Sequence, residues 1–418
     1  MSTTFMRNIT HRQLFLSHVA QTSRFPLALE IDSAEGVYMH DVNGKKYYDL
    51  ISGIGVSNVG HRHPAVVAAI KEQVDRYLHL MVYGEYVQAP QVLLAAALVG
   101  SLDSPLAETA PYGPINRVYF TNSGTEAVEG AMKLAKRFTG RFGFVACKDA
   151  YHGASQGALS LAGQAFFQEN FRPLLPGMTR IRYGVVEDLE QIDHRTAGLV
   201  IEPIGGESGV RVPDIDYMRA VRKRCTETGT LLILDEVQTG FGRSGTFWAF
   251  EDFGIYPDIL LSAKGMGGGM PIGAFMASET VMSVLMENPI LGHITTFGGH
   301  PVSCAAALAA FDVIQSERLH EAAGRKGQLI KDYLGAHPLV KEVRGKGLML
   351  AVEFDSFPLL KQIIDRLIEV GIVTDWFLFC DHSMRIAPPL IITEEQISEV
   401  CRKIIGVLDE IELKVKDK

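Results

Sequence analysis

Short apolar runs alternate with helical segments through the middle of the chain. Residues 117–120, 144–147, 198–201 and 231–234 form such runs. Residues 125–138, between the first two, carry apolar side chains at helical spacing. Runs without polar alternation are typical of strands buried on both faces, as in mostly parallel sheets covered by helices. The alternation therefore predicts an α/β fold.

The pattern differs on both sides of this region. A helix is expected near residues 8–20, and Asn43-Gly44 lies between β-prone runs, which is a strong hairpin signal for residues 36–50. After about residue 315, two helical stretches surround a strand near 347–354. With 418 residues the chain is long enough for two cores. We expect an N-terminal segment (1–60), a large ligand-binding domain (61–315) and a smaller α+β domain (316–418) that packs with the N-terminal segment.

Two charged residues follow buried runs. Asp235 ends the run 231–234, and Lys264 follows the run 259–263. Both should reach the carboxyl edge of the sheet, where open α/β sheets bind ligands. A lysine can form a Schiff base and an aspartate can keep a pyridine nitrogen protonated, which are the two groups that pyridoxal phosphate chemistry needs. A metal site at Asp235 is not indicated, because no histidine cluster supports it. The adjacent Glu236 is expected to form a structural ion pair.

A possible phosphate site lies where the strand near residue 120 meets the next helix. Ser123, Gly124 and Thr125 offer backbone N–H groups and hydroxyls at the start of this helix. The alternative is an ordinary N-cap with Glu126 in the first turn, which needs no ligand. The position alone does not decide between them.

Three further residues have two interpretations each. Tyr151 could stack on a flat cofactor or be an ordinary loop tyrosine. His152 could be a general base, although a loop histidine bonded to backbone is favoured. Glu207 could meet a substrate or an arginine, or it could be a solvated loop carboxylate.

Charge and cysteine content exclude several classes of function. The formal net charge is -8 and no long basic run occurs, so neither nucleic acid nor an anionic membrane is indicated as a partner. The five cysteines show no CxxC spacing, which favours reduced thiols. No signal peptide pattern and no apolar stretch of about 20 residues is present. We therefore expect a soluble cytoplasmic enzyme.

Taken together, the motifs resemble the class III aminotransferases, within the fold type I family of pyridoxal-phosphate enzymes. The resemblance runs from about residue 25 to 405. The motifs occur in the order GHRHP, TNSGTEAVEGAMKLAKR, YHG, EPIGGESGV, LILDEVQTGFGR, PDILLSAKGMGGGMPIGA, TTFGGHP, RGKGLML and RIAPPL. The resemblance implies an α/β large domain with a mostly parallel seven-stranded sheet, a smaller α+β domain, and pyridoxal 5'-phosphate as cofactor.

The resemblance also implies residue roles. Lys264 holds the cofactor aldehyde and transfers the substrate proton, and Asp235 pairs with the ring nitrogen. Thr296 reaches the phosphate bound by a neighbouring subunit, which implies a homodimer with shared active sites, and a tetramer of two dimers stays open. The resemblance further implies that Val237 and Tyr151 cover the two ring faces and that Gln238 lies near the phenolic oxygen. The phosphate is then bound by Ser123, Gly124 and Thr125.

Glu207 and Arg385 match a pair that acts as a switch in several members of the family. The arginine binds an α-carboxylate, and the glutamate neutralises it when the substrate presents none. The implied reaction moves an amino group from an amino acid or amine to a 2-oxo acid, 2-oxoglutarate or pyruvate, in a ping-pong cycle. Acetylornithine, ornithine and 4-aminobutyrate aminotransferases have a carboxylate-binding arginine where this chain has Ala154. The difference argues against those activities and favours broader ω-aminotransferases, unless another arginine replaces it.

Two alternative functions stay open from the sequence. Racemases, aminomutases and phospho-lyases of the same family use the same lysine and aspartate, although the Glu207–Arg385 pair favours transamination. A non-catalytic protein that binds pyridoxal phosphate would be expected to lack Lys264 or Asp235, and this chain has both.

Overall fold

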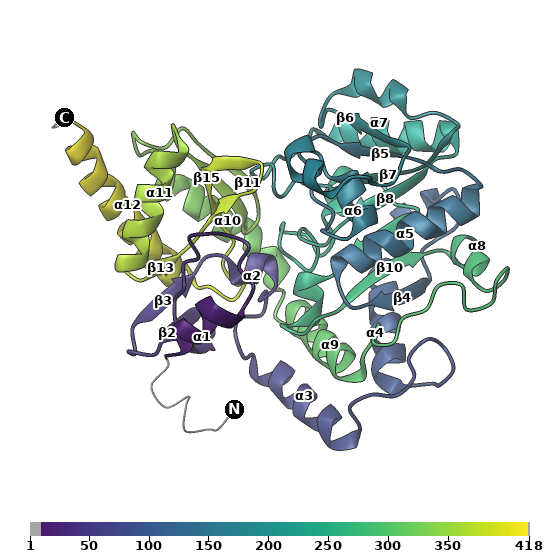
Figure 1. Ribbon diagram of the computed structural model, residues 1–418, viewed down its shortest axis with the longest axis horizontal. Helices are drawn as coiled ribbons and strands as arrows, with labels where there is room; N and C mark the ends of the chain where they lie inside the picture. Colours follow the sequence, from purple (N-terminus) through teal and green to yellow (C-terminus); the bar gives the residue numbers. More distant parts are fainter. Residues whose placement is uncertain (1–9, 417–418) are drawn as a thin grey trace.

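The computed structural model describes residues 10–416. Its largest sheet has seven strands and lies in the right half of Figure 1. The strand order is β4-β10-β9-β8-β7-β5-β6. The β10 strand runs in the opposite direction to the other six strands of this sheet. The strands are β4 (Arg117–Thr121), β5 (Gly143–Cys147), β6 (Met178–Ile181), β7 (Thr196–Ile201), β8 (Leu231–Asp235), β9 (Ile259–Ser262) and β10 (Gly273–Ala277). The predicted α/β fold with a mostly parallel seven-stranded sheet is confirmed.

Both faces of this sheet are covered, which explains the absence of polar alternation in its strands. Ile233 of β8 belongs to a core formed with α5 (Gly124–Thr139), which lies across one face. Its neighbours Leu232 and Leu234 belong to the core on the other face, together with buried residues of α7 (Ile215–Thr228). Successive side chains of one strand thus supply two separate cores.

The N-terminal region forms a small antiparallel sheet. The predicted hairpin is confirmed, with β2 (Tyr38–Asp41) and β3 (Lys46–Asp49) joined through Asn43-Gly44. Gly44 has φ +80°, which favours glycine at this turn. The expected helix at 8–20 corresponds to α1 (His11–His18), and residues 8 and 9 lie outside the described residues. The other strands of this sheet are β1 (Ile31–Glu35) and β13 (Ile372–Val373), which pairs in parallel with β3.

The C-terminal region contains a second four-stranded sheet, which we call the C-terminal sheet. Its order is β11-β12-β15-β14, and its helices and strands occupy the left half of Figure 1. The last helix begins after Thr393, whose hydroxyl accepts a hydrogen bond from the Gln396 amide N–H. The elements are α10 (Leu319–Leu334), β11 (Glu342–Lys346), β12 (Met349–Glu353), α11 (Phe357–Glu369), β14 (Trp376–Phe377), β15 (Cys380–Ile386) and α12 (Glu394–Lys416).

The remaining helices connect or flank these sheets. The α9 helix packs on α3 and α4 at the lower side of Figure 1. No helix within residues 10–416 is both long and apolar enough to span a bilayer. The helices not yet named are α2 (Ser52–Gly55), α3 (Pro64–Arg76), α4 (Ala89–Gly100), α6 (Gln156–Leu161), α8 (Glu279–Met282) and α9 (Pro301–Ser316).

Candidate active site

A cavity of ≈ 530 Å³ lies at the carboxyl edge of the parallel strands. Residues that follow β4, β5, β7, β8 and β9 all line it, as expected for an open α/β sheet. The sequence-predicted residues on its wall are Ser123, Gly124, Thr125, Tyr151, Asp235, Val237, Gln238 and Lys264.

One end of the cavity is the N-terminus of α5. Ser123 is the N-cap and accepts a hydrogen bond from the Glu126 amide at 3.3 Å. The Thr125 hydroxyl is 2.7 Å from the Ser155 hydroxyl. Gly153 has φ +129°, and a Cβ there would lie 2.3 Å from Thr125 Oγ1, so this backbone passes directly over Thr125. The helix dipole and the free N–H groups at this end favour an anion.

The buried carboxylate of Asp235 is fixed from two sides. Its Oδ2 lies 2.7 Å from His152 Nδ1, and its Oδ1 accepts a hydrogen bond from the Val237 amide at 3.1 Å. The expectation that His152 bonds to backbone is wrong, because its ring contacts this carboxylate. Glu202, also on the cavity wall, was not predicted. Burial raises the pKa of Glu202 to about 7.

Lys264 enters the cavity from a strained backbone position. Its φ of +46° is in the left-handed region, which non-glycine residues adopt at a cost and which is common at functional sites. Burial lowers the pKa of the Lys264 amine, and the nearby Glu207 and Asp235 carboxylates oppose this effect. Within the part of the chain that the structure describes, no hydrogen bond engages this amine. It is therefore available to a ligand.

Glu207 and Arg385 form a buried ion pair. Arg385 Nη2 lies 3.2 and 3.1 Å from the two Glu207 carboxylate oxygens, and both side chains are 5% exposed. Arg385 Nε also donates to Asp375 at 2.8 Å, a partner that the sequence did not indicate. Burial alone would raise the pKa of Glu207, but Arg385 lowers it below its usual value. The alternative of a solvated loop glutamate is wrong.

Gln238 joins this pair to the cavity, since its Nε2 donates to Glu207 Oε1 at 3.1 Å. Thr296 is exposed and lies away from the cavity wall of its own chain. The expected ion pair of Glu236 is also wrong. Glu236 is buried and accepts hydrogen bonds from the Phe250 amide and the Thr239 hydroxyl.

These groups fit pyridoxal phosphate. An available amine, a buried carboxylate and a helix N-terminus line the same cavity, at Lys264, Asp235 and Ser123. They match the aldehyde, the ring nitrogen and the phosphate of the cofactor in charge and in donor type. Val237 and Tyr151 supply an aliphatic and an aromatic surface for its ring.

Comparisons with known proteins agree with this arrangement. The chain superposes on the ornithine aminotransferase from Toxoplasma gondii with a TM-score of 0.88 and 32% identity, over 99% of this chain and 98% of that chain, and that structure has pyridoxal phosphate at partial occupancy. An (S)-enantioselective omega-transaminase from Thermomicrobium roseum superposes with a TM-score of 0.86 and 29% identity. The match covers 96% of this chain and 97% of that chain.

Sequence relatives are similar over most of their length. An acetylornithine aminotransferase of Methanopyrus kandleri is 41% identical over 94% of this chain and 96% of its own. A putrescine aminotransferase of Pectobacterium atrosepticum is 42% identical over 89% of this chain and 80% of its own. The family model for class-III aminotransferases matches residues 19–408. The chain therefore belongs to the class-III aminotransferases, and the transaminase activity and pyridoxal phosphate cofactor predicted from its sequence are confirmed.

Proposed function

We propose that this transaminase takes an amino group from a donor without a carboxylate near the cofactor and passes it to a 2-oxo acid. The observation that carries the proposal is the buried Glu207–Arg385 ion pair, beside a cavity whose wall carries no arginine. Arg385 is the carboxylate-binding group for 2-oxoglutarate or pyruvate. Glu207 neutralises Arg385 while the donor is bound.

The chemistry divides among the residues of the cavity. When bound, pyridoxal phosphate supplies an aldehyde for the amino group and a protonated ring that withdraws electrons from the substrate carbon. Lys264 accepts the proton from that carbon and returns it one position away, because its buried amine is readily neutral. Asp235, oriented by His152, keeps the positive charge at the ring nitrogen.

The other contacts orient the cofactor. Ser123, Gly124 and Thr125 bind the phosphate at the start of α5. Tyr151 and Val237 cover the two ring faces, and Gln238 lies toward the ring oxygen, next to Glu207.

The donor class follows from the apolar part of the cavity wall. Ala154 stands where the resemblance to acetylornithine, ornithine and 4-aminobutyrate aminotransferases implies an arginine, and no arginine replaces it among the residues of this chain that line the cavity. Val56, Met270 and Ile272 make this wall largely apolar. A terminal amine whose tail has no carboxylate fits it better than one whose tail ends in a carboxylate, as the tail of N-acetylornithine does.

The test is a panel of half-reactions on the purified holoenzyme. Putrescine, N-acetylornithine and a simple apolar amine are added singly without acceptor, and the visible absorption of the cofactor is followed. We expect putrescine or the apolar amine to convert the cofactor to its amino form faster than N-acetylornithine. A preference for N-acetylornithine would contradict the donor class. Racemisation or loss of a leaving group without this conversion would instead support a racemase, aminomutase or phospho-lyase.

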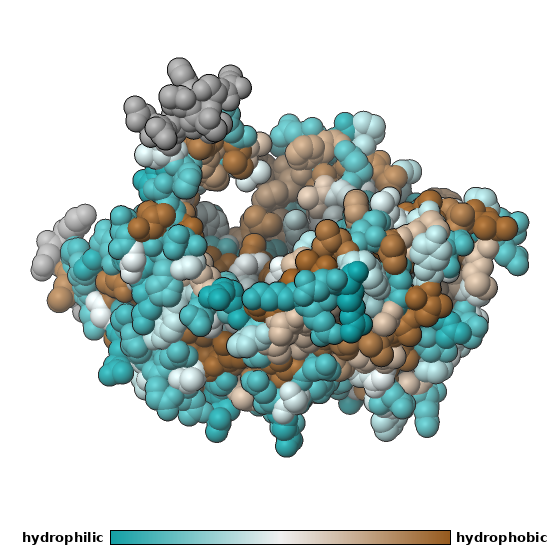
Figure 2. Space-filling model, turned by 90° about the horizontal axis from the view of Figure 1, so that it is seen from below, coloured by the Kyte–Doolittle hydropathy of each residue, from teal (hydrophilic) through white to brown (hydrophobic). Residues whose placement is uncertain are grey.

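We also propose a homodimer with shared active sites. Exposed apolar side chains gather on two segments, 78–93 and 290–297, and include Leu78, Tyr86, Val87, Leu93, Ile290 and Phe297. Figure 2, which shows the lower side of the molecule, has hydrophobic patches around a hollow on this face. Large exposed apolar patches are typical of interfaces, and Thr296 belongs to the second segment. The proposed setting is the cytoplasm, where the five free cysteines stay reduced.

Mixing inactive variants tests the shared site. Lys264→Ala and Thr296→Arg are each expected to be nearly inactive as homodimers. In a mixed dimer, one site combines an intact Lys264 with an intact Thr296 of the other subunit, so activity should return after the two are refolded together. Failure to recover any activity, with a mixed dimer present, would contradict sharing.

A further inference from the structure

Arg344 of β11 lies at the junction between the C-terminal sheet and the segment that carries Glu207. It is 8% exposed, and its guanidinium donates in several directions. Nε donates to the Gly209 carbonyl at 2.6 Å, and Nη2 donates to the Ser383 hydroxyl at 3.0 Å. Nη1 donates to Glu342 at 3.1 Å and to Glu353. One side chain thus links β11, β12 and β15 to residue 209.

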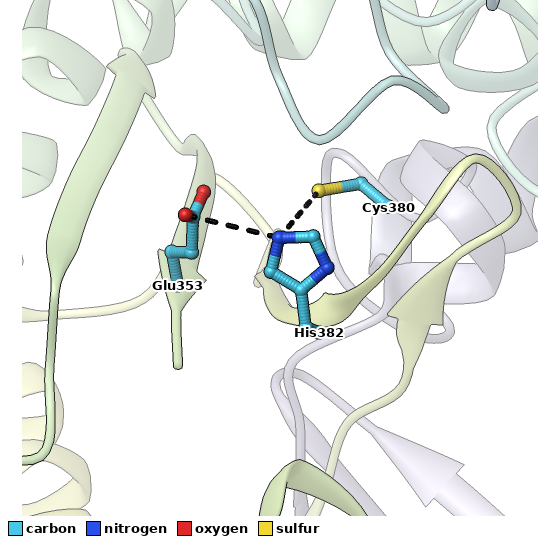
Figure 3. A group of neighbouring side chains, drawn as sticks. All are labelled: Glu353, Cys380 and His382. Carbon is cyan, nitrogen blue, oxygen red and sulfur yellow. Dashed lines mark hydrogen bonds and ion pairs between the residues drawn. The ribbon is translucent and has the colours of Figure 1, made fainter. Parts of the chain in front are cut away.

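Figure 3 shows three side chains on the adjoining strands β12 and β15. His382 Nε2 lies 3.8 Å from Glu353 Oε1 and 3.9 Å from Cys380 Sγ. These residue types could ligate a metal. Arg344, however, already donates to Glu353 and lies 3.5 Å from Cys380 Sγ. The guanidinium therefore supplies the positive charge beside this group.

The segment held by Arg344 is a closed loop, residues 205–211, which we call the Glu207 loop. Gly205 and Arg211 close it through two backbone hydrogen bonds of 2.9 Å. Gly209 has φ +83°, and a Cβ there would lie 2.6 Å from Arg344 Nη2. The backbone of the loop therefore rests directly on the guanidinium, and no larger residue fits between them.

The same loop is held at Glu207 by the turn between β14 and β15. The Phe379 amide donates to the Glu207 carbonyl at 3.1 Å, and the Leu378 amide donates to its carboxylate at 3.2 Å. Arg344 bonds to both segments that meet at Glu207. One bond goes to Ser383 on β15, and the other goes to Gly209, two residues after Glu207 in the loop. A shift of the Arg344 guanidinium would change the position of Glu207 relative to Arg385.

We propose that Arg344 is a positioning residue for the Glu207–Arg385 switch. This inference rests on the proposed function of that pair. During the donor half-reaction Glu207 must stay on Arg385, and during the acceptor half-reaction its carboxylate must leave while its backbone remains in place. Arg344 fixes the backbone and leaves the carboxylate free to move, since it bonds to Gly209 and not to the Glu207 side chain.

Lysine at position 344 keeps the charge but loses the planar set of donors, so it cannot bridge Gly209, Ser383 and Glu353 together. A looser Glu207 loop makes the Glu207–Arg385 pair less favourable, because ordering it then costs more entropy. Arg344→Lys should therefore slow the half-reaction with an amine donor and spare the half-reaction with the 2-oxo acid. Residues that act through such contacts change coupling by 0.5–2 kcal/mol, so the ratio of the two rate constants should fall roughly 2- to 30-fold.

The experiment measures both half-reactions separately by stopped-flow absorbance on the holoenzyme, with the best donor of the panel and with 2-oxoglutarate. The variants are Arg344→Lys, Glu207→Gln and the double variant. Arg366→Lys, the same change in a half-exposed surface ion pair, is the matched control and should leave the ratio unchanged. Ser383→Ala removes one acceptor of Arg344, should shift the ratio in the same direction by less, and serves if Arg344→Lys does not fold.

The outcomes separate the inference from the proposed function. A lower ratio in Arg344→Lys, together with a double variant whose ratio is no lower than that of Glu207→Gln alone, supports positioning through Glu207. Equal losses in both half-reactions would overturn it, because a purely structural role predicts no selectivity. If Glu207→Gln alone leaves the ratio unchanged, the switch itself is wrong. If Glu207→Gln lowers the ratio and neither Arg344→Lys nor Ser383→Ala does, only the role of Arg344 is wrong.

Discussion

Replacing Glu236 by glutamine should stabilise this protein at alkaline pH and leave it unchanged at acidic pH. Glu236 is 1% exposed and has only neutral hydrogen-bond partners, the Phe250 amide and the Thr239 hydroxyl. Burial raises the pKa of this carboxyl from its ordinary 4.5 to about 7. A glutamine has the same shape as the protonated acid and can keep both hydrogen bonds, with Thr239 accepting from the amide.

The magnitude follows from proton linkage. Below pH 4.5 the carboxyl is protonated in both the folded and the unfolded chain, so it imposes no penalty. Between pH 4.5 and 7 only the unfolded chain ionises, and stability falls as pH rises; above pH 7 the whole penalty is present. The interval from 4.5 to 7, at 1.36 kcal/mol per pH unit, gives about 3 kcal/mol. For 418 residues the unfolding entropy is about 0.9 kcal/mol/K, so this corresponds to about 3 to 4 °C in Tm.

The assay compares Tm of the wild type and Glu236→Gln at pH 4 and pH 8, at constant ionic strength and cofactor concentration. Glu227→Gln, on the exposed side of α7, is the control and should shift neither value. Glu202 and Glu251 also have pKa values raised to about 7 by burial and are present in every variant. The charge of Glu251 also raises the pKa of Glu236, so it adds to the penalty that Glu236→Gln removes at pH 8. A Tm increase of equal size at both pH values, or a decrease at pH 8, would refute the reasoning.

Two other predictions concern the cofactor cavity. His152→Leu removes the donor to Asp235 and should weaken pyridoxal phosphate binding roughly 10- to 150-fold, the equivalent of one hydrogen bond to a charged group. His152→Asn keeps a donor near the Nδ1 position and should bind almost normally in equilibrium dialysis, so equal losses would argue against this role. Gly153→Ala forces a methyl group into Thr125 and should weaken binding at the phosphate end, measured by competition between the cofactor and inorganic phosphate. Gly140→Ala, at φ +68° with open space around it, places a methyl group on another glycine with positive φ and should leave the affinity unchanged.

Sequence patterns predicted the parts of the fold that depend on local chemistry. The β8 strand is apolar from Leu231 to Leu234, and α5 follows a strong N-cap at Ser123, so both elements were recognisable. The β11 strand was not, because Glu342 to Lys346 is largely polar. It forms by pairing with β12, the next strand along the chain, and the residues of β11 themselves give no strand pattern.

In the active site, too, residues marked by a local sequence pattern were predicted and those that depend on tertiary contacts were not. Asp235 and Lys264 were found because each follows a buried strand, and the structure brings both to one cavity. His152 and Asp375 were not assigned to their partners, because the contacts cross 83 and 10 residues of sequence. The wrong ion pair for Glu236 has a similar cause. A glutamate next to a strand end usually meets a cation, but here the fold surrounds it with backbone and a hydroxyl.

The single antiparallel strand of the large sheet has a consequence for redesign. Because β10 starts at the edge where β9 ends, the chain between Lys264 and Gly273 stays at the cavity and contributes Met270, Pro271 and Ile272 to its wall. A parallel strand would have required a crossover that leads away from this edge. Residues 270–272 can therefore be exchanged to resize the substrate space while both flanking strands keep their register, whereas Gly269 has φ +104° and should stay glycine. Gly273 sets the limit, since a Cβ there would lie 2.3 Å from the Ser123 carbonyl.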